Sequence, residues 1–173
     1  MRRRLFLLHM AAWCLTPGLV LVRPNLALST TRETDKVTKT DAEWQQILTP
    51  EQYQILRRAG TEPPFSSPLN AEHRPGTFVC AGCQAPLFTS ESKFDSGTGW
   101  PSFFIAIPER IETKIDFHLI YPRTEYHCAR CGGHQGHVFN DGPQPTGKRY
   151  CNNGLALNFI PLETERSPSV PNG

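Results

Sequence analysis

The chain has 173 residues, of which 38% are hydrophobic and 20% charged, so it carries enough apolar material for one packed domain and lacks the composition of a disordered chain. Its formal net charge is +2, and without the four arginines that precede Ser29 the basic residues number 14 against 16 acidic ones. This near-neutral body excludes a nucleic-acid binder held by phosphate contacts. The 16 prolines and 13 glycines favour turns and short strands, which excludes a coiled coil or a helical bundle.

Residues 1–29 have the pattern of an export signal. Three arginines at positions 2–4 precede an apolar stretch over residues 5–22, and a small-residue exit follows at Ala27-Leu28-Ser29. The arginines and the Leu5-Phe6-Leu7 sequence after them resemble the twin-arginine export motif. We therefore expect export to the periplasm or an equivalent lumen. A membrane anchor through residues 5–22, retained without cleavage, stays open as the alternative.

The next segments divide the rest of the chain. Residues 30–40 are polar and rich in threonine, which predicts a flexible linker, and we expect residues 164–173 to form a flexible tail. The folded domain is therefore expected over residues 41–163. Trp44, followed by apolar residues at helical spacing, and the helix start at Thr49-Pro50 predict short helices at the beginning of this domain.

The pattern changes from Thr61 onward to short apolar bursts separated by turn residues. Bursts of this length, with alternation in places, are typical of strands, so the main body is predicted to be mostly antiparallel β. The predicted strands cover residues 77–79, 86–88, 118–121, 136–139 and 155–160.

Four of the six cysteines form two Cys-x-x-Cys pairs, Cys80 with Cys83 and Cys128 with Cys131, and both pairs share the frame aromatic-x-Cys-Ala-x-Cys. Two tight turns of this kind supply the four tetrahedral thiolates of a structural zinc site, which leaves no coordination position open for water. Disulfides, which an exported protein can form, are one alternative. A redox-active Cys-x-x-Cys motif is the other.

A further cysteine, Cys151, has the surroundings of a reactive thiol. Arg149 is two residues away, and His134, His137 and Asp141 lie shortly upstream. Positive charge lowers the pKa of a thiol and nearby imidazoles can move protons, so these residues point to a nucleophilic cysteine. The alternative is a small buried hydrophobic residue.

Glycines flank a Trp-Pro pair in the segment Gly97-Thr98-Gly99-Trp100-Pro101. A loop of this kind can hold Trp100 at a surface, where an aromatic ring can contact a ligand. Packing of the ring at a turn is the equal alternative, because the sequence of the loop fits both.

Taken together, these segments resemble the methionine-R-sulfoxide reductase B family. The two Cys-x-x-Cys pairs, Gly-Trp-Pro-Ser-Phe, His-x-Gly-His-Val-Phe-x-Asp-Gly-Pro and Arg-Tyr-Cys-x-Asn occur in family order, and the resemblance covers residues 41–162. It implies two antiparallel β-sheets with short N-terminal helices, braced by one structural Zn²⁺ on the four paired cysteines. It also implies a monomer without nucleic-acid partners that repairs oxidised methionine, in proteins and possibly free, after oxidative stress.

The resemblance also assigns roles to the site residues. Cys151 would attack the sulfur of methionine-R-sulfoxide, leaving methionine and a sulfenic acid on Cys151. His137 would supply or relay the proton that the sulfoxide oxygen needs. His134 and Asp141 would organise the site, and Arg149 would favour the thiolate. Asn153 would hydrogen-bond near the nucleophile, and Trp100 would contact the S-methyl group.

The chain departs from the family at the resolving cysteine, whose place between the two glycines is taken by Thr98. We therefore expect a cycle with a single catalytic cysteine. Its sulfenic acid would be reduced by a thioredoxin-like, glutaredoxin-like or small-molecule thiol. A zinc-knuckle interaction module without catalysis and a cysteine hydrolase are the alternatives in other functional classes.

Overall fold

The computed structural model describes residues 36–117 and 121–163 of the protein. By its internal contacts the chain divides into Met1–Thr31 and Arg32–Gly173, and every described residue belongs to the second unit. The predicted export signal and the predicted tail therefore lie outside the described residues. Within the described part, no helix combines the length and the apolar character that a membrane crossing requires.

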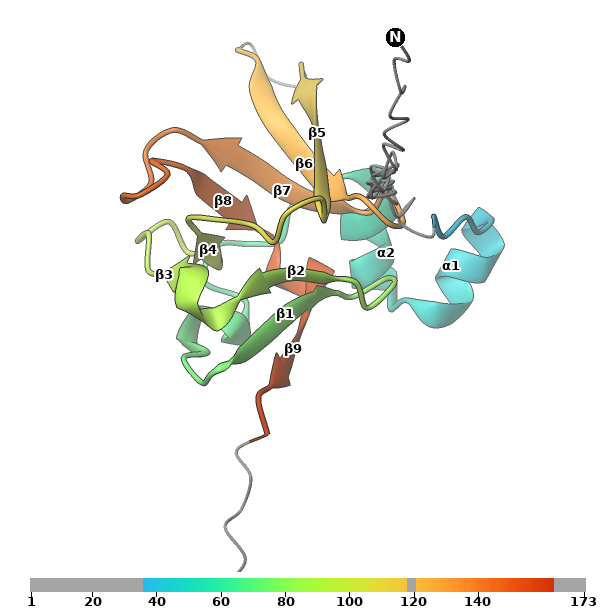
Figure 1. Ribbon diagram of the computed structural model, residues 1–173. Coiled ribbons are helices and arrows are strands. Elements are labelled where there is room, and N and C mark those ends of the chain that lie inside the picture. Colours follow the sequence, from blue (N-terminus) through green and yellow to red (C-terminus); the bar gives the residue numbers. More distant parts are fainter. Residues whose placement is uncertain (1–35, 118–120, 164–173) are drawn as a thin grey trace, which may run out of the picture. The chain divides into compact units, whose positions relative to one another are not determined.

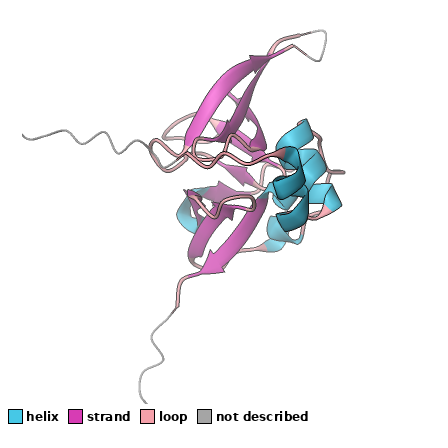
Figure 2. Cartoon of the chain, turned by 90° about the vertical axis from the view of Figure 1, so that its right-hand side faces the viewer, coloured by secondary structure: helices cyan, strands magenta, loops and turns pink. Residues whose placement is uncertain are grey.

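Two α-helices open the described part, each started by a threonine. Thr40 and Thr49 both form capping boxes. In each, the threonine side chain accepts from a backbone N–H of the first turn, and the side chain three residues on accepts from the backbone N–H of the threonine. The second helix closes on Ala59 in the left-handed region, just before Gly60. The predicted short helices are thereby confirmed. They are α1 (Asp41–Ile47) and α2 (Pro50–Arg58), which Figures 1 and 2 show side by side.

The end of the predicted linker is attached to the domain. Lys36 forms an ion pair with Glu112 at 2.6 Å and donates to the carbonyl of Ala129 at 2.7 Å. The backbone N–H of Val37 donates to the carbonyl of Arg130 at 2.8 Å, and its side chain packs against the core. Residues 36–40 are thus part of the folded domain, which corrects their assignment to a linker.

The strands form two antiparallel sheets, as the fold prediction states. The smaller sheet has the order β2-β1-β9 and the larger has the order β3-β4-β8-β7-β6-β5. Figure 1 shows β1, β2 and β9 in one layer and β5 to β8 in another. The strands are β1 (Gly76–Cys80), β2 (Pro86–Thr89), β3 (Lys93–Phe94), β4 (Ser102–Phe103), β5 (Ile111–Asp116), β6 (Arg123–Cys128), β7 (His134–Phe139), β8 (Arg149–Asn152) and β9 (Leu157–Pro161).

Three predicted strands are confirmed, as β1, β2 and β7. The predicted strand at 155–160 begins instead at Leu157, because Gly154–Ala156 form a 3₁₀ turn. Most of the predicted strand at 118–121 lies outside the described residues. The sequence patterns did not indicate the two-residue strands β3 and β4, nor β5, β6 and β8, whose residues are largely polar.

Aromatic side chains from both sheets meet in the core. Phe88 of β2 stacks on Phe103 of β4 with ring centroids 4.2 Å apart, and Phe78 of β1 meets Phe103 edge-on at 4.9 Å. Tyr126 of β6 approaches Phe88 edge-on at 6.2 Å. These contacts join the two sheets, because each pairs a ring of the smaller sheet with a ring of the larger one. The smaller sheet is therefore packed against the larger sheet through β4 and β6, which lie on either side of β8 and β7.

Candidate active site and metal centre

Cys151 lies on β8, in the interior of the six-stranded sheet. Its register partners are His137 on β7 and Ser102 on β4. A Cβ atom on Gly136 would collide with the carbonyl oxygen of Cys151, so glycine is required for the close approach of β7 and β8. Cys151 opens on a cavity of about 120 Å³, which is lined also by Thr61, Trp100, Arg123, His137, Phe139 and Asn153.

The pKa of the Cys151 thiol is raised above its ordinary value. Burial is the largest cause because it disfavours the thiolate, while the positive charge of Arg149 acts in the opposite direction. Arg149 is itself bound by both carboxylate oxygens of Asp141, at 2.9 and 2.8 Å, and its guanidinium lies over the ring of Phe139 at 4.3 Å. The sequence predicted a thiol whose pKa is lowered by Arg149. The structure corrects this, because burial outweighs the partly neutralised arginine.

A chain of hydroxyl groups leads away from the Cys151 sulfur. Thr98 Oγ1 lies 4.0 Å from Cys151 Sγ, Ser96 Oγ lies 2.8 Å from Thr98 Oγ1, and Ser102 Oγ lies 2.8 Å from Ser96 Oγ. Ser102 donates its one hydroxyl hydrogen to the Trp100 carbonyl at 3.1 Å. Since each hydroxyl has one hydrogen, Ser96 then donates to Ser102 and Thr98 donates to Ser96. Thr98 is left to accept from the Cys151 S–H, which matches a neutral resting thiol.

His137 is the imidazole beside Cys151, and a buried carboxylate contacts its ring. Its Nε2 lies 2.8 Å from Oδ2 of Asp116, the last residue of β5. The same carboxylate oxygen accepts from Arg123 Nη2 at 2.6 Å. Because a carboxylate only accepts, Nε2 carries a proton, and Nδ1 is the ring nitrogen left to serve a ligand in the cavity.

His134 occupies a second, more buried position. Its Nδ1 lies 2.8 Å from Oε1 of Glu125, which also pairs with Lys114 at 3.2 Å. The ring is 4% exposed, and burial lowers the pKa of His134. The centroids of the His134 and His137 rings are 5.6 Å apart. His134 therefore packs behind His137 as a neutral ring and does not line the cavity.

Glu62 joins the two sides of the cavity. Its backbone carbonyl accepts from Trp100 Nε1 at 3.1 Å, and its backbone N–H donates to Oδ1 of Asn153 at 3.0 Å. Its buried carboxylate accepts from the backbone N–H groups of Gly154 and Leu155, at 2.5 and 2.9 Å. Trp100 thus lines the cavity wall, with its indole N–H bonded, and does not belong to the buried core.

The structure brings most of the predicted site residues together. Cys151, His137, Trp100 and Asn153 line one cavity, although the amide of Asn153 bonds to backbone atoms of Glu62 and Gln135 rather than to the thiol. Asp141 does not line the cavity, and its side chain is 60% exposed. Sequence reasoning missed Asp116, Arg123, Glu125 and Glu62.

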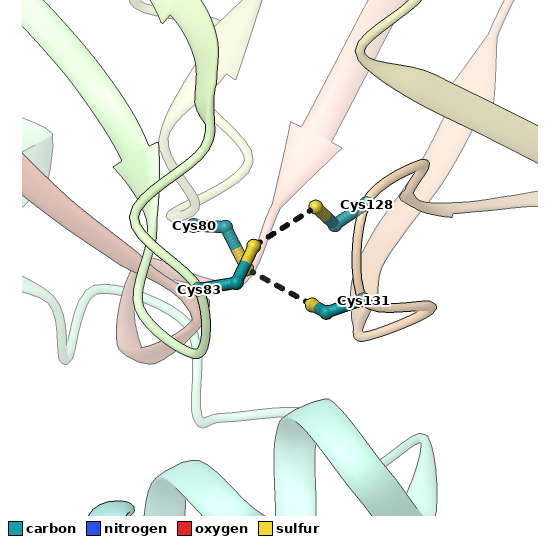
Figure 3. Close-up of side chains that lie close together, drawn as sticks. All are labelled: Cys80, Cys83, Cys128 and Cys131. Atoms are coloured by element: carbon teal, nitrogen blue, oxygen red, sulfur yellow. Dashed lines mark hydrogen bonds between the residues drawn. The ribbon is translucent and has the colours of Figure 1, made fainter. Parts of the chain in front are cut away.

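The four paired cysteines form a separate cluster, as predicted. All four sulfur atoms lie within 4.8 Å of one another, and none of them is in a disulfide. Cys80 Sγ is 3.7 Å from Cys131 Sγ, and Cys83 Sγ is 3.5 Å from Cys128 Sγ (Figure 3). A tetrahedral ion with metal–sulfur bonds of about 2.3 Å requires sulfurs roughly 3.8 Å apart. The cluster therefore fits one metal ion, and Figure 3 shows the two turns presenting their sulfurs to one point.

The two turns have the same backbone hydrogen bonds. In each, the N–H four residues after the first cysteine donates to that cysteine's carbonyl at 2.8 Å, from Gln84 and from Gly132. Both of these residues have a positive φ, 59° and 68°. The N–H of each first cysteine also donates at 2.9 Å to the carbonyl five residues on. The internal repeat seen in the sequence is therefore a repeat of structure.

A buried side chain links the cluster to β8, the strand of Cys151. Gln135 Nε2 lies 3.4 Å from Cys80 Sγ, and its Oε1 lies 3.5 Å from Nδ2 of Asn152, the residue after Cys151. The Asn152 Oδ1 atom accepts from the hydroxyl of Tyr126 at 2.6 Å. The cluster lies outside the cavity and supports it from behind.

Comparisons with known proteins agree with this geometry. Residues 48–161 match the family model described as the SelR domain. The chain is 52% identical over 124 residues to "Peptide methionine sulfoxide reductase MsrB" of Methanosarcina barkeri, covering 71% of this chain and 87% of that protein. It is 52% identical over 126 residues to the protein of the same name from Hahella chejuensis, covering 72% and 91%. It is also 50% identical over 128 residues to "Peptide methionine sulfoxide reductase B1, chloroplastic" of Arabidopsis thaliana, covering 73% and 63%. The chain therefore belongs to the methionine-R-sulfoxide reductase B, or SelR, family of oxidoreductases.

Proposed function

We propose that this protein reduces methionine-R-sulfoxide to methionine, with Cys151 as the nucleophile. One observation carries the proposal. Cys151 is the one described cysteine outside the four-sulfur cluster, and it opens on a cavity that also presents an imidazole, His137, and an aromatic wall, Trp100. The relatives are named as methionine sulfoxide reductases, which fits this combination of groups.

The reaction needs ionisation of the thiol and protonation of the sulfoxide oxygen. Cys151 passes its proton to Nδ1 of His137 as substrate enters, and its sulfur attacks the electrophilic sulfur of the substrate. His137 donates a proton from Nδ1 to the sulfoxide oxygen, which weakens the S–O bond. Two electrons pass from the cysteine sulfur to the substrate sulfur, and one oxygen is transferred in net terms. The products are methionine and a sulfenic acid on Cys151.

Trp100 and Phe139 give the cavity its apolar side. A methyl thioether makes favourable contacts with aromatic rings, so the S-methyl group is placed against this wall. His137, on β7, takes the oxygen, while Cys151 approaches from β8. Three fixed directions around one sulfur atom select one of the two sulfoxide epimers. Oxidised methionine in exposed protein segments is the proposed substrate, because the shallow cavity holds a side chain rather than a whole polypeptide.

The cycle closes with an external thiol. Thr98, not a cysteine, is the side chain nearest to Cys151 on the Gly97–Gly99 loop. Two molecules of thiol, or one dithiol, reduce the sulfenic acid to the thiol and are oxidised to a disulfide, with release of water. The reductant is a thioredoxin-like or glutaredoxin-like protein or a small thiol.

The four-cysteine cluster is proposed to hold Zn²⁺. When bound, the ion supplies no chemistry to substrate, since four thiolates complete its tetrahedral shell, and it stabilises the turns that carry β1, β6 and β7. The arginine-rich, apolar beginning of the sequence supports export, so we propose repair of oxidised proteins outside the cytoplasm. A zinc module without catalysis has no observation in its favour, because Cys151 and His137 would then be unused.

Single-turnover reduction tests the proposal. Pre-reduced protein is incubated without reductant with methionine-R-sulfoxide or methionine-S-sulfoxide, and methionine is quantified by chromatography. We expect about one equivalent of methionine from the R epimer and none from the S epimer. The Cys151→Ser variant should give none, while it retains its bound zinc and its thermal stability. Equal activity in Cys151→Ser, or turnover of the S epimer alone, would disprove the assignment.

A further inference from the structure

We infer that Asp116, held by Arg123, is a positioning residue for His137, which fixes the imidazole so that Nδ1 faces the substrate and carries the proton that it donates. This inference rests on the proposed reductase function. It adds a buried carboxylate and a guanidinium, from β5 and β6, to a site otherwise built on β4, β7 and β8.

The contacts of Asp116 suit it to this task. Its side chain is 4% exposed, and one carboxylate oxygen, Oδ2, faces both His137 Nε2 at 2.8 Å and Arg123 Nη2 at 2.6 Å. Arg123 and Asp116 are register partners at the ends of their strands, so the pair is fixed by backbone pairing. Arg123 also lines the cavity, which places the whole trio beside the substrate. A buried carboxylate with two charge-assisted bonds has little freedom to move.

Two similar trios show what distinguishes this one. The described residues hold three arrangements of cation, carboxylate and imidazole on β5, β6 and β7. In the second, the ring is His134, which is buried and absent from the cavity lining. In the third, the carboxylate is Glu112, which is 51% exposed. Only the Asp116 trio joins a buried carboxylate to a ring that lines the cavity. The trios are Arg123–Asp116–His137, Lys114–Glu125–His134 and Lys36–Glu112–His127.

The carboxylate has two consequences for the proton of His137. It holds a proton on Nε2, so the neutral ring cannot place its single proton on Nδ1 while the contact lasts. Nδ1 is therefore free to take the thiol proton of Cys151 and to pass it to the sulfoxide oxygen. Arg123 donates to the same oxygen, so Oδ2 accepts from both partners. Among the described residues, the titratable and charged groups that face His137 are Asp116 on β5, Arg123 and Glu125 on β6, His134 on β7 and Cys151 on β8.

The test compares Asp116→Asn with Glu112→Gln, the matched variant in the exposed trio. The first-step rate and the KM for methionine-R-sulfoxide are measured from pH 5 to pH 9 in the full chain. For Asp116→Asn we expect a fall in the rate of at least about tenfold with little change in KM. Glu112→Gln should match the wild type. Asp116→Glu should recover part of the rate.

A spectroscopic measurement separates positioning from a loss of structure. Nitrogen-15 NMR of the histidine rings reports which nitrogen carries the proton. We expect the Nε2–H form of His137 in the wild type and its loss in Asp116→Asn, in protein whose zinc content and melting temperature are unchanged. A slow variant that keeps the Nε2–H form, or an Asp116→Asn variant of normal rate, would overturn the inference. If the wild type fails to reduce either epimer, the proposed function fails, whereas the ring measurement still decides the Asp116 contact.

Discussion

The opposing charges of Arg149 and Asp141 set how readily Cys151 ionises, and removing them one at a time should change thiol reactivity in opposite directions. Burial raises the pKa of the Cys151 thiol, the nearby Arg149 lowers it, and Asp141 raises it. The Arg149→Met variant replaces the guanidinium, which lies over the ring of Phe139, with an uncharged and unbranched side chain. The Asp141→Asn variant keeps the shape and leaves the arginine charge without its neutralising partner.

The structure sets the expected magnitudes. An opposite charge close to an ionisable group changes its ionisation by one to three powers of ten. Two hydrogen bonds from Arg149 to Asp141 partly neutralise the guanidinium, so the lower end applies. We expect Arg149→Met to slow alkylation of Cys151 at neutral pH about tenfold. Asp141 is 60% exposed and screened by solvent, so Asp141→Asn should accelerate alkylation by a smaller factor, roughly threefold.

The assay is the rate of iodoacetamide modification of Cys151 as a function of pH, followed by peptide mass spectrometry in zinc-loaded protein. Lys148→Met is the matched control, because it also removes one positive charge, from the residue next to Arg149. The Lys148 ammonium group is bound to Asn140 at 2.6 Å. Its alkylation rate should equal that of the wild type. The reasoning is refuted if Arg149→Met accelerates alkylation, or if Arg149→Met and Asp141→Asn change the rate in the same direction.

Three further predictions concern the loop, the strand contact and the cluster. Thr98→Cys should form an internal disulfide with Cys151 after one turnover, because Thr98 Oγ1 is 4.0 Å from the Cys151 sulfur and glycines with positive φ flank Thr98. Non-reducing peptide mapping detects this disulfide, and the Thr98→Val variant should show none. Gly136→Ala should lower the melting temperature by several degrees and slow the first step about tenfold, since the added methyl group would displace the Cys151 backbone. Calorimetry and single-turnover kinetics measure these two effects. Gly82→Ala is the control, because an added methyl group there would make only ordinary van der Waals contacts. Zinc chelation should release one ion per chain and unfold the domain, as followed by metal analysis and circular dichroism; a fully stable metal-free protein would contradict the structural role.

Local signals made part of the fold predictable. The helix start at Thr49-Pro50 was read correctly because a capping box and a first-turn proline act within four residues. The four cysteines were read correctly because each turn closes its own hydrogen bonds and each sulfur pair is adjacent in sequence. The prediction of two antiparallel sheets came from the family resemblance, since strand order depends on pairings across the whole chain.

Two of the missed residues lie far along the chain from the residues that they contact. Asp116 lies 21 residues from His137, and Glu62 lies 91 residues from Asn153, so no spacing rule connects them. Glu62 lies outside the strands, and the charged residues of β5 alternate with Ile111, Thr113 and Ile115, so the pattern does not show which of them meets a histidine. The direction of the Cys151 pKa was missed for a related reason. The sequence displayed the nearby arginine and did not display the burial that outweighs it.

Chemical trapping after one turnover measures the central step most directly. Pre-reduced protein receives methionine-R-sulfoxide together with dimedone, which reacts with sulfenic acids, and every cysteine-containing peptide is then analysed by mass spectrometry. The account predicts a dimedone adduct on Cys151 alone, in proportion to the methionine produced, with the four clustered cysteines unmodified. An adduct confined to other cysteines, or methionine produced with Cys151 neither trapped nor oxidised, would contradict it.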